Sequence, residues 1–209
     1  MQASWYFDFI SPFAWLQLPK VVALRERVAI EPVPILFAAV LDRLGQLGPA
    51  EIPAKRRFTY RFVQWLAAQE GTLLRFPPAH PFNPLPALRL CVAAGGDWPA
   101  VEAIFRHIWQ EGRDTDAASL QTVAGSLGVT DIAQALAAPA VKEAVRDNTE
   151  RALAAGVFGV PTLLIGDEAF WGNDATAMAA DYLARPETFA TPEYARIDAL
   201  PLGIERKRG

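Results

Sequence analysis

The sequence predicts an α/β protein in which both ends of the chain build one sheet and the middle forms a helical insertion. Three observations carry this prediction. The chain opens on an apolar, aromatic strand pattern at residues 4–9. From Phe37 to about Arg146 the pattern is almost wholly helical, and strand patterns return only at Thr162–Ile165. The 209 residues, with a hydrophobic content of 52%, suffice for one large domain with an inserted subdomain.

The N-terminal segment predicts a strand, a helix and a second strand. Residues 4–9 are apolar on both faces, which is typical of a strand buried inside a sheet. The pattern changes at Ser11 and Pro12, because serine is a preferred helix N-cap and proline is favoured at the first helical position. We expect this helix to run from Pro12 to about Arg27. Val28–Ile35 then has the pattern of a strand, and its prolines predict an edge position or an early end.

The insertion is predicted to consist of helices separated by loops. The expected helices lie at residues 38–44, 54–69, 85–94, from 98 to about 108, at 120–127 and at 132–136. Asp97 is placed to cap the fourth of these helices and Thr130 the last. The proline-dense run Phe76–Pro84 cannot be regular. We interpret His107 as a surface or boundary residue. Four tryptophans are interpreted as core residues, some of which line a substrate pocket: Trp15, Trp65, Trp98 and Trp109.

The C-terminal part predicts a return to the sheet. A long helix from Pro139 to Ala155 ends at Gly156. Thr162–Ile165 and residues 169–171 then form a hairpin, and a last helix opens at residues 172–174. We interpret Glu187 to Gly209 as mostly tail, with a solvated end at Glu205–Arg208. We therefore expect one domain from residues 1–37 and 147–209, and a helical insertion domain from residues 38–146.

Composition excludes several classes of function. The net charge of −3 gives no electrostatic reason to expect binding to nucleic acid or to an anionic membrane. The single cysteine, Cys91, excludes an internal disulfide and is interpreted as a buried core residue. His80 and His107 lack the spacing of metal ligands, so we expect no metal site. With no signal-peptide pattern and no apolar run long enough to span a membrane, we expect a cytoplasmic protein.

Ser11 is the first candidate functional residue. It stands where a buried strand runs directly into the start of a helix. A helix start presents unpaired N–H groups and a partial positive charge, which together favour an anion. The alternative interpretation is a plain N-cap serine with no chemistry. Ser11 does not lie in a Gly-x-Ser-x-Gly elbow, so a serine hydrolase is a poor fit.

Two segments at the ends of the chain resemble a known family. Phe7–Ala14 resembles the opening of the 2-hydroxychromene-2-carboxylate isomerases and the kappa-class glutathione transferases, within the DsbA-like group. Gly156–Thr162, followed by Phe170–Asp174, resembles their C-terminal signature, and the middle segments Pro53–Lys55 and Phe82–Asn83 also fit. The resemblance extends to about Arg185. It implies a thioredoxin-like fold with a large all-helical insertion.

The resemblance implies a role for Ser11 and for a proline. In the redox members of this fold, two cysteines occupy the strand-to-helix turn, where this chain has Ser11 and Ala14. Thiol–disulfide exchange is therefore excluded at this site, because the thiolate nucleophile is missing. In the isomerases and kappa-class transferases, the serine hydrogen-bonds the sulfur of bound glutathione, so Ser11 is the expected catalytic residue. Val160–Pro161 resembles the cis-proline whose preceding residue meets glutathione's peptide, the alternative being an ordinary trans proline.

Further site residues follow from the same resemblance. Asp174, with Asn173 beside it, is expected to receive the ammonium group of glutathione. The alternative for Asp174 is a helix N-cap, and both roles can hold at once. Lys55 either pairs with a glutathione carboxylate or is a solvated lysine. Asn83 either binds substrate or caps the following helix, and Phe13 is expected to contact substrate. The family often carries an asparagine that contacts the cofactor in the loop before the lysine, and here residues 48–53 contain none. Either the backbone alone makes this contact or the cofactor site is altered.

The resemblance predicts a glutathione-dependent isomerase that acts by reversible thiolate addition on a small, aromatic-derived molecule. The alternatives are a kappa-class-like glutathione transferase and a non-enzymatic binding module that has lost its cysteines. A homodimer is expected by resemblance, with neither nucleic acid nor membrane as partner and no metal.

Overall fold

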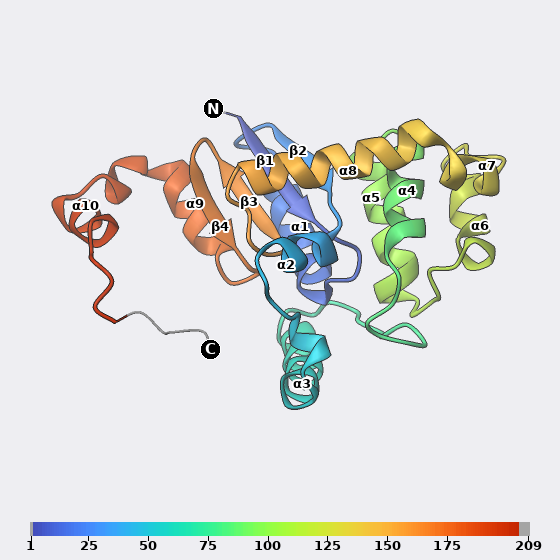
Figure 1. Ribbon diagram of the computed structural model, residues 1–209, viewed down its shortest axis with the longest axis horizontal. Coiled ribbons are helices and arrows are strands. Elements are labelled where there is room, and N and C mark those ends of the chain that lie inside the picture. The colour runs from blue at the N-terminus through green and yellow to red at the C-terminus, as the bar shows by residue number, and fades with distance from the viewer. Residues whose placement is uncertain (1, 205–209) are drawn as a thin grey trace.

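The computed structural model describes residues 2–204 of the chain. Its centre is a four-stranded sheet in the order β2-β1-β3-β4 (Figure 1). The strands are β1 (Ala3–Phe7), β2 (Ile30–Pro34), β3 (Thr162–Ile165) and β4 (Glu168–Trp171). β1 pairs parallel with β2 and antiparallel with β3, and β3 pairs antiparallel with β4. The two ends of the chain therefore build one sheet, as the strand patterns predicted.

Each strand takes the place that its sequence predicts. β1 is central, and its alternate side chains enter two different cores: Trp5 and Phe7 on one face, Tyr6 on the other. β2 is an edge strand, as its two prolines predicted, since a proline has no N–H to donate to a second neighbour. The hairpin from β3 to β4 is likewise confirmed.

Helices cover both faces of the sheet (Figure 1). The first layer contains α1 (Pro12–Leu24) and α9 (Thr176–Ala184), which pack with Trp5, Phe7 and the insertion. The opposite layer contains α2 (Phe37–Arg43) and one end of α8 (Pro139–Ala154). α8 reaches from the insertion to the sheet and passes through the predicted domain boundary at residue 147.

The insertion packs on the sheet through a continuous apolar core. The insertion contains α4 (Leu85–Ala93), α5 (Trp98–Phe105), a π turn (Arg106–Gln110), α6 (Ala117–Ser126) and α7 (Ile132–Ala137). Phe105 lies 4.6 Å from Phe9, ring centre to ring centre, and 5.5 Å from Phe7. The long helix α3 (Pro53–Gln69) follows the short turn η1 (Pro49–Glu51) and projects from the lower side of the molecule.

The structure corrects three expectations about single residues of the insertion. Trp65 is 56% exposed, because only the Val63 and Ala67 side of α3 faces the core. His107 is buried and bonded to the Asp114 carbonyl and the Ser119 hydroxyl, so it is not a surface residue. Asp131, rather than Thr130, caps α7 through the Gln134 N–H.

The segment interpreted as tail also contains regular structure. A 3-10 turn, η3 (Pro186–Phe189), precedes a short helix, α10 (Pro192–Asp198). Phe189 packs against Tyr182 of α9, with ring centres 5.2 Å apart, and this contact holds the segment to the body. The basic end at residues 205–208 lies outside the described residues. Among residues 2–204, no helix has both the length and the apolarity that crossing a bilayer requires.

Candidate active site

Ser11 lies at the carboxyl end of the central strand and begins α1. Its backbone is extended (φ −89°, ψ 113°), and its Oγ accepts the Ala14 N–H at 3.3 Å. The Ser11 N–H donates to the Asp8 carbonyl at 3.0 Å, which closes a tight turn after β1. Ser11 is only 8% exposed. Its hydroxyl therefore lies where the N–H groups of the first turn of α1 are directed, as the sequence predicted.

The cis-proline turn emerges from the same edge of the sheet. The Val160–Pro161 bond is cis, as the resemblance implied. Because Tyr6 is paired with Thr162 across the antiparallel β1–β3 ladder, the chain after Phe7 and the chain before Thr162 emerge side by side. The indole of Trp171 lies against Gly159, where a Cβ would collide with the Trp171 Nε1 atom. Glycine is therefore required at this position while the indole keeps its place.

The turn between β4 and α9 is tied to both of these elements. The Gly172 N–H donates to the Pro161 carbonyl at 2.9 Å. The buried amide of Gln17, on α1, donates to the Gly172 carbonyl at 2.8 Å and to the Thr176 hydroxyl at 3.0 Å. Gln17 also accepts the indole N–H of Trp5 at 2.7 Å. These bonds bring residues 172–174 next to the cis-proline and fix them relative to α1.

Asn173 and Asp174 differ in exposure and in partners. The Asn173 amide is buried, with its oxygen bonded to Lys20 at 2.8 Å and its nitrogen to Glu70 at 3.1 Å. Lys20 and Glu70 form a salt bridge of 2.7 Å, so this trio joins α1, the end of α3 and the turn. Asp174 is exposed, and its carboxylate does not cap α9, whose N-cap is Ala175. The capping alternative for Asp174 is wrong, and its carboxylate faces solvent beside the cis-proline turn.

α3 supplies one side of the site. Phe13, two residues after Ser11, lies 6.4 Å from Phe62 on α3, ring centre to ring centre. Phe62 in turn stacks on Phe58 at 5.6 Å. Lys55 is exposed in the first turn of the same helix, seven residues before Phe62 and therefore roughly 10 Å along the helix axis.

Asn83 lies in the loop before α4. Its side-chain oxygen accepts the Leu85 N–H at 3.1 Å, and its carbonyl accepts the Thr115 hydroxyl at 3.3 Å. The local role that the sequence left open for Asn83, satisfying the start of the helix, is therefore present. Its expected contact with substrate stays a prediction.

Asp8 is a residue at this site that the sequence reasoning missed. Its carboxylate is fully buried and accepts two backbone N–H bonds, from Ile10 at 3.1 Å and from Phe37 at 2.9 Å. Burial raises the pKa of Asp8 from 3.8 to about 7, and the two backbone hydrogen bonds only partly oppose this shift. The available signal was a single acid in an otherwise apolar strand segment.

His80 is the second missed residue, because sequence reasoning weighed it only as a metal ligand. Its Nε2 lies 2.8 Å from the Ile10 carbonyl, and its Nδ1 lies 2.6 Å from the Tyr60 hydroxyl. Burial lowers the pKa of His80, partly opposed by the bond to Ile10. Among residues 2–204, no three His, Cys, Asp or Glu side chains gather as a metal site would require.

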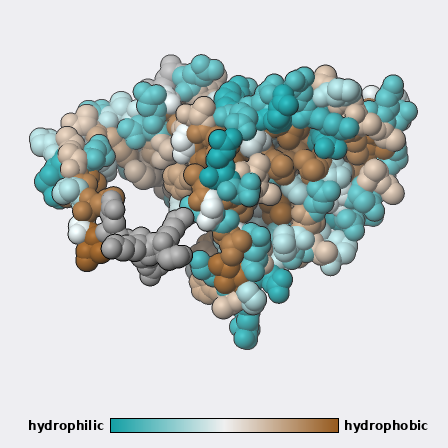
Figure 2. Space-filling view, in the orientation of Figure 1, coloured by the Kyte–Doolittle hydropathy of each residue, from teal (hydrophilic) through white to brown (hydrophobic). Residues whose placement is uncertain are grey.

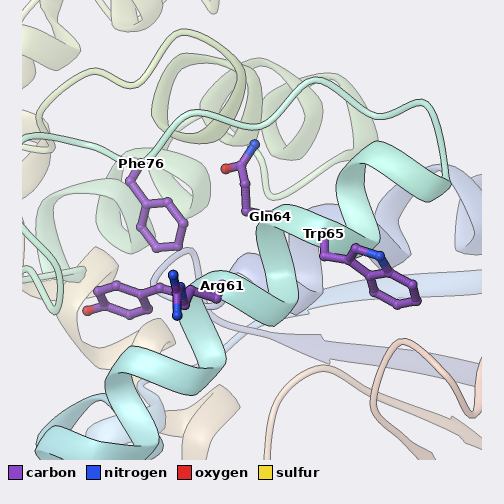
Figure 3. A pocket seen from close by; sticks show the side chains of 5 residues that line it. Arg61, Gln64, Trp65 and Phe76 are labelled. Atoms are coloured by element: carbon purple, nitrogen blue, oxygen red, sulfur yellow. The ribbon is translucent and has the colours of Figure 1, made fainter.

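A shallow groove of about 510 Å³ runs along α3 beside these residues. Figure 3 shows Arg61 and Gln64 rising from α3 toward Phe76, with Trp65 farther along the helix. Tyr60 also lines the groove, so its hydroxyl connects the groove to His80 and the turn before Ser11. Brown and teal side chains lie side by side on the projecting part of the molecule where α3 lies (Figure 2).

The residues present fit the groups of a glutathione molecule. The chain offers a hydroxyl and a helix start for a thiolate, and backbone groups beside a cis-proline for an extended peptide. It also offers the exposed carboxylate of Asp174 for an ammonium group and the exposed amine of Lys55 for a carboxylate. The buried side-chain amide of Asn173 is already paired within the chain, and its carbonyl accepts the Thr176 hydroxyl at 2.8 Å, which leaves its backbone N–H for a ligand.

Comparison with known proteins agrees with this geometry. A family model of the DSBA-like thioredoxin domain matches residues 3–184. A 2-hydroxychromene-2-carboxylate isomerase from Pseudomonas putida is 31% identical over 193 residues, which cover 88% of this chain and 95% of that relative. The chain belongs to the 2-hydroxychromene-2-carboxylate isomerase family, within the DSBA-like thioredoxin proteins.

Two further relatives of this isomerase-family chain bear on its fold and function. A solved structure of a 2-hydroxychromene-2-carboxylate isomerase matches it with a TM-score of 0.76 at 27% identity, covering 91% of this chain and 100% of that one. Glutathione S-transferase kappa 2 from Caenorhabditis elegans is 25% identical over 206 residues, which cover 88% of this chain and 92% of that relative. The family and the thioredoxin-like fold expected from the motifs are therefore confirmed.

Proposed function

We propose that this protein is a glutathione-dependent isomerase of the 2-hydroxychromene-2-carboxylate type. The observation that carries the proposal is a serine hydroxyl at the start of α1, on the same edge of the sheet as a cis-proline turn, without a cysteine in either. Such a site can hold a thiolate but cannot supply one. The relatives named 2-hydroxychromene-2-carboxylate isomerase support the isomerase, and those named glutathione S-transferase kappa support glutathione.

Each residue of the site has a task in this proposal. The Ser11 hydroxyl donates to the sulfur, and the start of α1 lowers the pKa of the thiol, which is ordinarily about 8.5. Val160 presents backbone groups to the peptide of the ligand, much as an added strand would. Asp174 and Lys55 hold its charged ends. Phe13 lies beside Ser11, where an aromatic-derived substrate would contact it, and Asn83 belongs to the loop expected to approach that substrate.

Bound glutathione would supply a thiolate that adds reversibly to a conjugated carbon, so that a double bond becomes single, rotates and re-forms. The protein's own contribution is to hold the thiolate and the substrate in one orientation and to exclude competing reactions. Orienting two reactants in this way accounts for much of the barrier reduction in many enzymes.

Calorimetric titration with glutathione tests the cofactor, and product analysis tests the reaction. We expect a saturable heat of binding and, with a 2-hydroxychromene-2-carboxylate substrate, isomer formed with no net loss of glutathione. A saturable heat with no isomer would overturn the reaction but not the cofactor. Absence of any binding heat would favour the cysteine-less binding module instead.

A glutathione transferase is the second candidate, because several relatives carry the kappa name. The same residues would serve it, since both reactions begin with a stabilised thiolate. The two differ in their products: a transferase consumes one glutathione for each substrate molecule, and an isomerase consumes none. The expected homodimer is a separate proposal, which sedimentation analysis of the full chain tests.

A further inference from the structure

We propose that His80, a residue of the helical insertion, is a positioning residue for Ser11 and connects the groove along α3 to the proposed thiolate site. The inference rests on the proposed function for its catalytic consequence. The structural part of the inference, that His80 holds the turn before Ser11, does not depend on the proposed function.

The turn between β1 and α1 is held by side chains at successive backbone groups. The Phe9 carbonyl accepts the indole N–H of Trp109 at 2.8 Å. The Ile10 N–H donates to the Asp8 carboxylate at 3.1 Å, and the Ile10 carbonyl lies 2.8 Å from His80 Nε2. Both backbone polar groups of Ile10 are therefore bonded to side chains. Of the side chains that hold this turn, Trp109 and His80 come from the insertion.

The bond from His80 acts on Ser11 through a rigid unit. The Ile10 carbonyl lies in the same planar peptide group as the N and Cα atoms of Ser11. Fixing that carbonyl therefore fixes the plane from which Ser11 extends, and two torsions of Ser11, the backbone φ and the side-chain χ1, then place Oγ. Displacing this plane would move Oγ relative to the start of α1, with no change in the sequence of the helix.

The hydrogen-bond pattern determines which nitrogen of His80 carries the proton. The Ile10 carbonyl can only accept, so Nε2 must be the donor. In the neutral ring Nδ1 is then an acceptor, and the Tyr60 hydroxyl, 2.6 Å from Nδ1 and 2.7 Å from the His80 carbonyl, shares its one proton between these two acceptors. Burial, which lowers the pKa of His80, favours this neutral form. The Ile10 carbonyl thus sets the tautomer, and the Tyr60 hydroxyl holds His80 at both its ring and its backbone carbonyl.

Tyr60 connects His80 to the groove along α3. It belongs to α3 and lines the groove together with Arg61, Gln64, Trp65 and Phe76. Only two contacts separate the groove wall from the peptide plane of Ser11: Tyr60 to His80, and His80 to Ile10. A molecule seated in the groove against Tyr60 would therefore act on the position of Ser11.

His80 also packs among aromatic rings, so the test must separate packing from hydrogen bonding. Its ring centre lies 5.5 Å from that of Trp109 and 5.8 Å from that of Phe82. His80→Phe keeps a planar ring and removes both nitrogens. His80→Gln keeps an N–H donor near the position of Nε2. His107→Phe is the matched control, because His107 is also a buried histidine of the insertion but bonds only to Asp114 and Ser119.

The principal measurement is the ultraviolet absorbance of the thiolate of bound glutathione across pH, with its affinity from calorimetry. We expect His80→Phe to raise the pKa of the bound thiol and to lower kcat about tenfold or more, with the Kd for glutathione changed less than about twofold. His80→Gln should recover most of the lost kcat. Tyr60→Phe should give a smaller change in the same direction. His107→Phe should lower stability and leave the pKa of the bound thiol unchanged.

Amide hydrogen exchange supplies a readout that needs no glutathione. We expect faster exchange at the Ser11 amide in His80→Phe than in the wild type, with protection regained in His80→Gln. If the wild type binds no glutathione, the proposed function fails and this measurement still tests the structural part. If His80→Phe folds and leaves both exchange and thiolate absorbance unchanged, the inference is overturned. If His80→Phe does not fold, an unchanged thiolate absorbance in Tyr60→Phe together with unchanged Ser11 exchange overturns it.

Discussion

The Ser11 hydroxyl accepts one bond within its own helix, and among residues 2–204 no acceptor takes its proton. That proton is available for an anion at the start of α1. We expect Ser11→Ala to weaken or abolish the thiolate absorbance of bound glutathione near neutral pH, because the donor is lost. Loss of the N-cap should also cost about 0.5–2 kcal/mol of unfolding free energy, measured with urea.

Ser11→Thr is the matched variant for this prediction, since it keeps both the hydroxyl and the capping oxygen. It should keep most of the thiolate absorbance. Full thiolate absorbance in Ser11→Ala would show that the N–H groups of the helix start are sufficient without the hydroxyl.

The buried carboxyl of Asp8 makes stability depend on pH. Its pKa is about 7 in the folded protein against 3.8 in the unfolded chain, so the folded state binds more protons between these values. Folding stability should therefore fall as pH rises from about 4 to about 7, by at most roughly 4 kcal/mol from this group. Asp8→Asn cannot ionise. We expect its unfolding free energy, relative to the wild type, to rise over that range in urea titrations.

The comparison with the wild type removes contributions from other groups, such as His80, whose lowered pKa works in the opposite direction. Asp8→Asn also carries a constant penalty, because one amide oxygen cannot replace two carboxylate oxygens that accept the Ile10 and Phe37 N–H groups. If the difference in unfolding free energy between Asp8→Asn and the wild type stays constant from pH 4 to pH 7, Asp8 does not titrate with a raised pKa in the folded protein.

At the scale of secondary-structure elements, Gln17 of α1 connects its helix to β1, to the turn after β4 and to α9. It bonds to Trp5 of β1, to Gly172 after β4 and to Thr176 of α9, while itself lying on α1. Leucine is similar in volume but would leave these buried groups without partners. We expect Gln17→Leu to lower the unfolding free energy by about 2–4 kcal/mol in urea. It should also weaken glutathione binding, because it releases the turn that carries Asp174.

The exposed Gln69, at the end of α3, offers a control of the same residue type. Gln69→Leu should change the unfolding free energy by no more than about 0.5 kcal/mol. A loss in Gln17→Leu no greater than that of Gln69→Leu would mean that the three buried bonds contribute nothing measurable.

The elements themselves were largely predictable from local chemistry. Pro12 after Ser11 and Gly156 after α8 marked real helix ends, and the prolines of β2 marked its edge position, because capping and proline geometry depend on a few neighbouring residues. The orientation of α3 was not predictable. Its aromatic stripe and its small buried residues have similar spacing, and only the position of the helix decides that Val63, rather than Trp65, faces the core.

At the scale of the whole molecule, the insertion and the sheet share one apolar core. Trp5, Phe7 and Phe9 lie in the same buried cluster as Ile104 and Phe105 of the insertion. We therefore expect the full chain to unfold in one cooperative step. The denaturant midpoints from far-ultraviolet circular dichroism and from tryptophan fluorescence should coincide. Two separated midpoints would instead show that residues 38–146 unfold independently.

The sequence alone determined the class of fold and the family, and it indicated Ser11 as the candidate catalytic residue. Those features depend on local patterns and on motifs that are visible in order along the chain. Only the tertiary structure showed the surroundings of Ser11: the buried Asp8, the bond from His80 to Ile10, and the Gln17 network around Gly172. The physical reason is that most of these bonds join residues far apart in sequence, as between Asp8 and Phe37, His80 and Ile10, and Gln17 and Gly172. Such partners leave no periodic signal in the side chains that supply them.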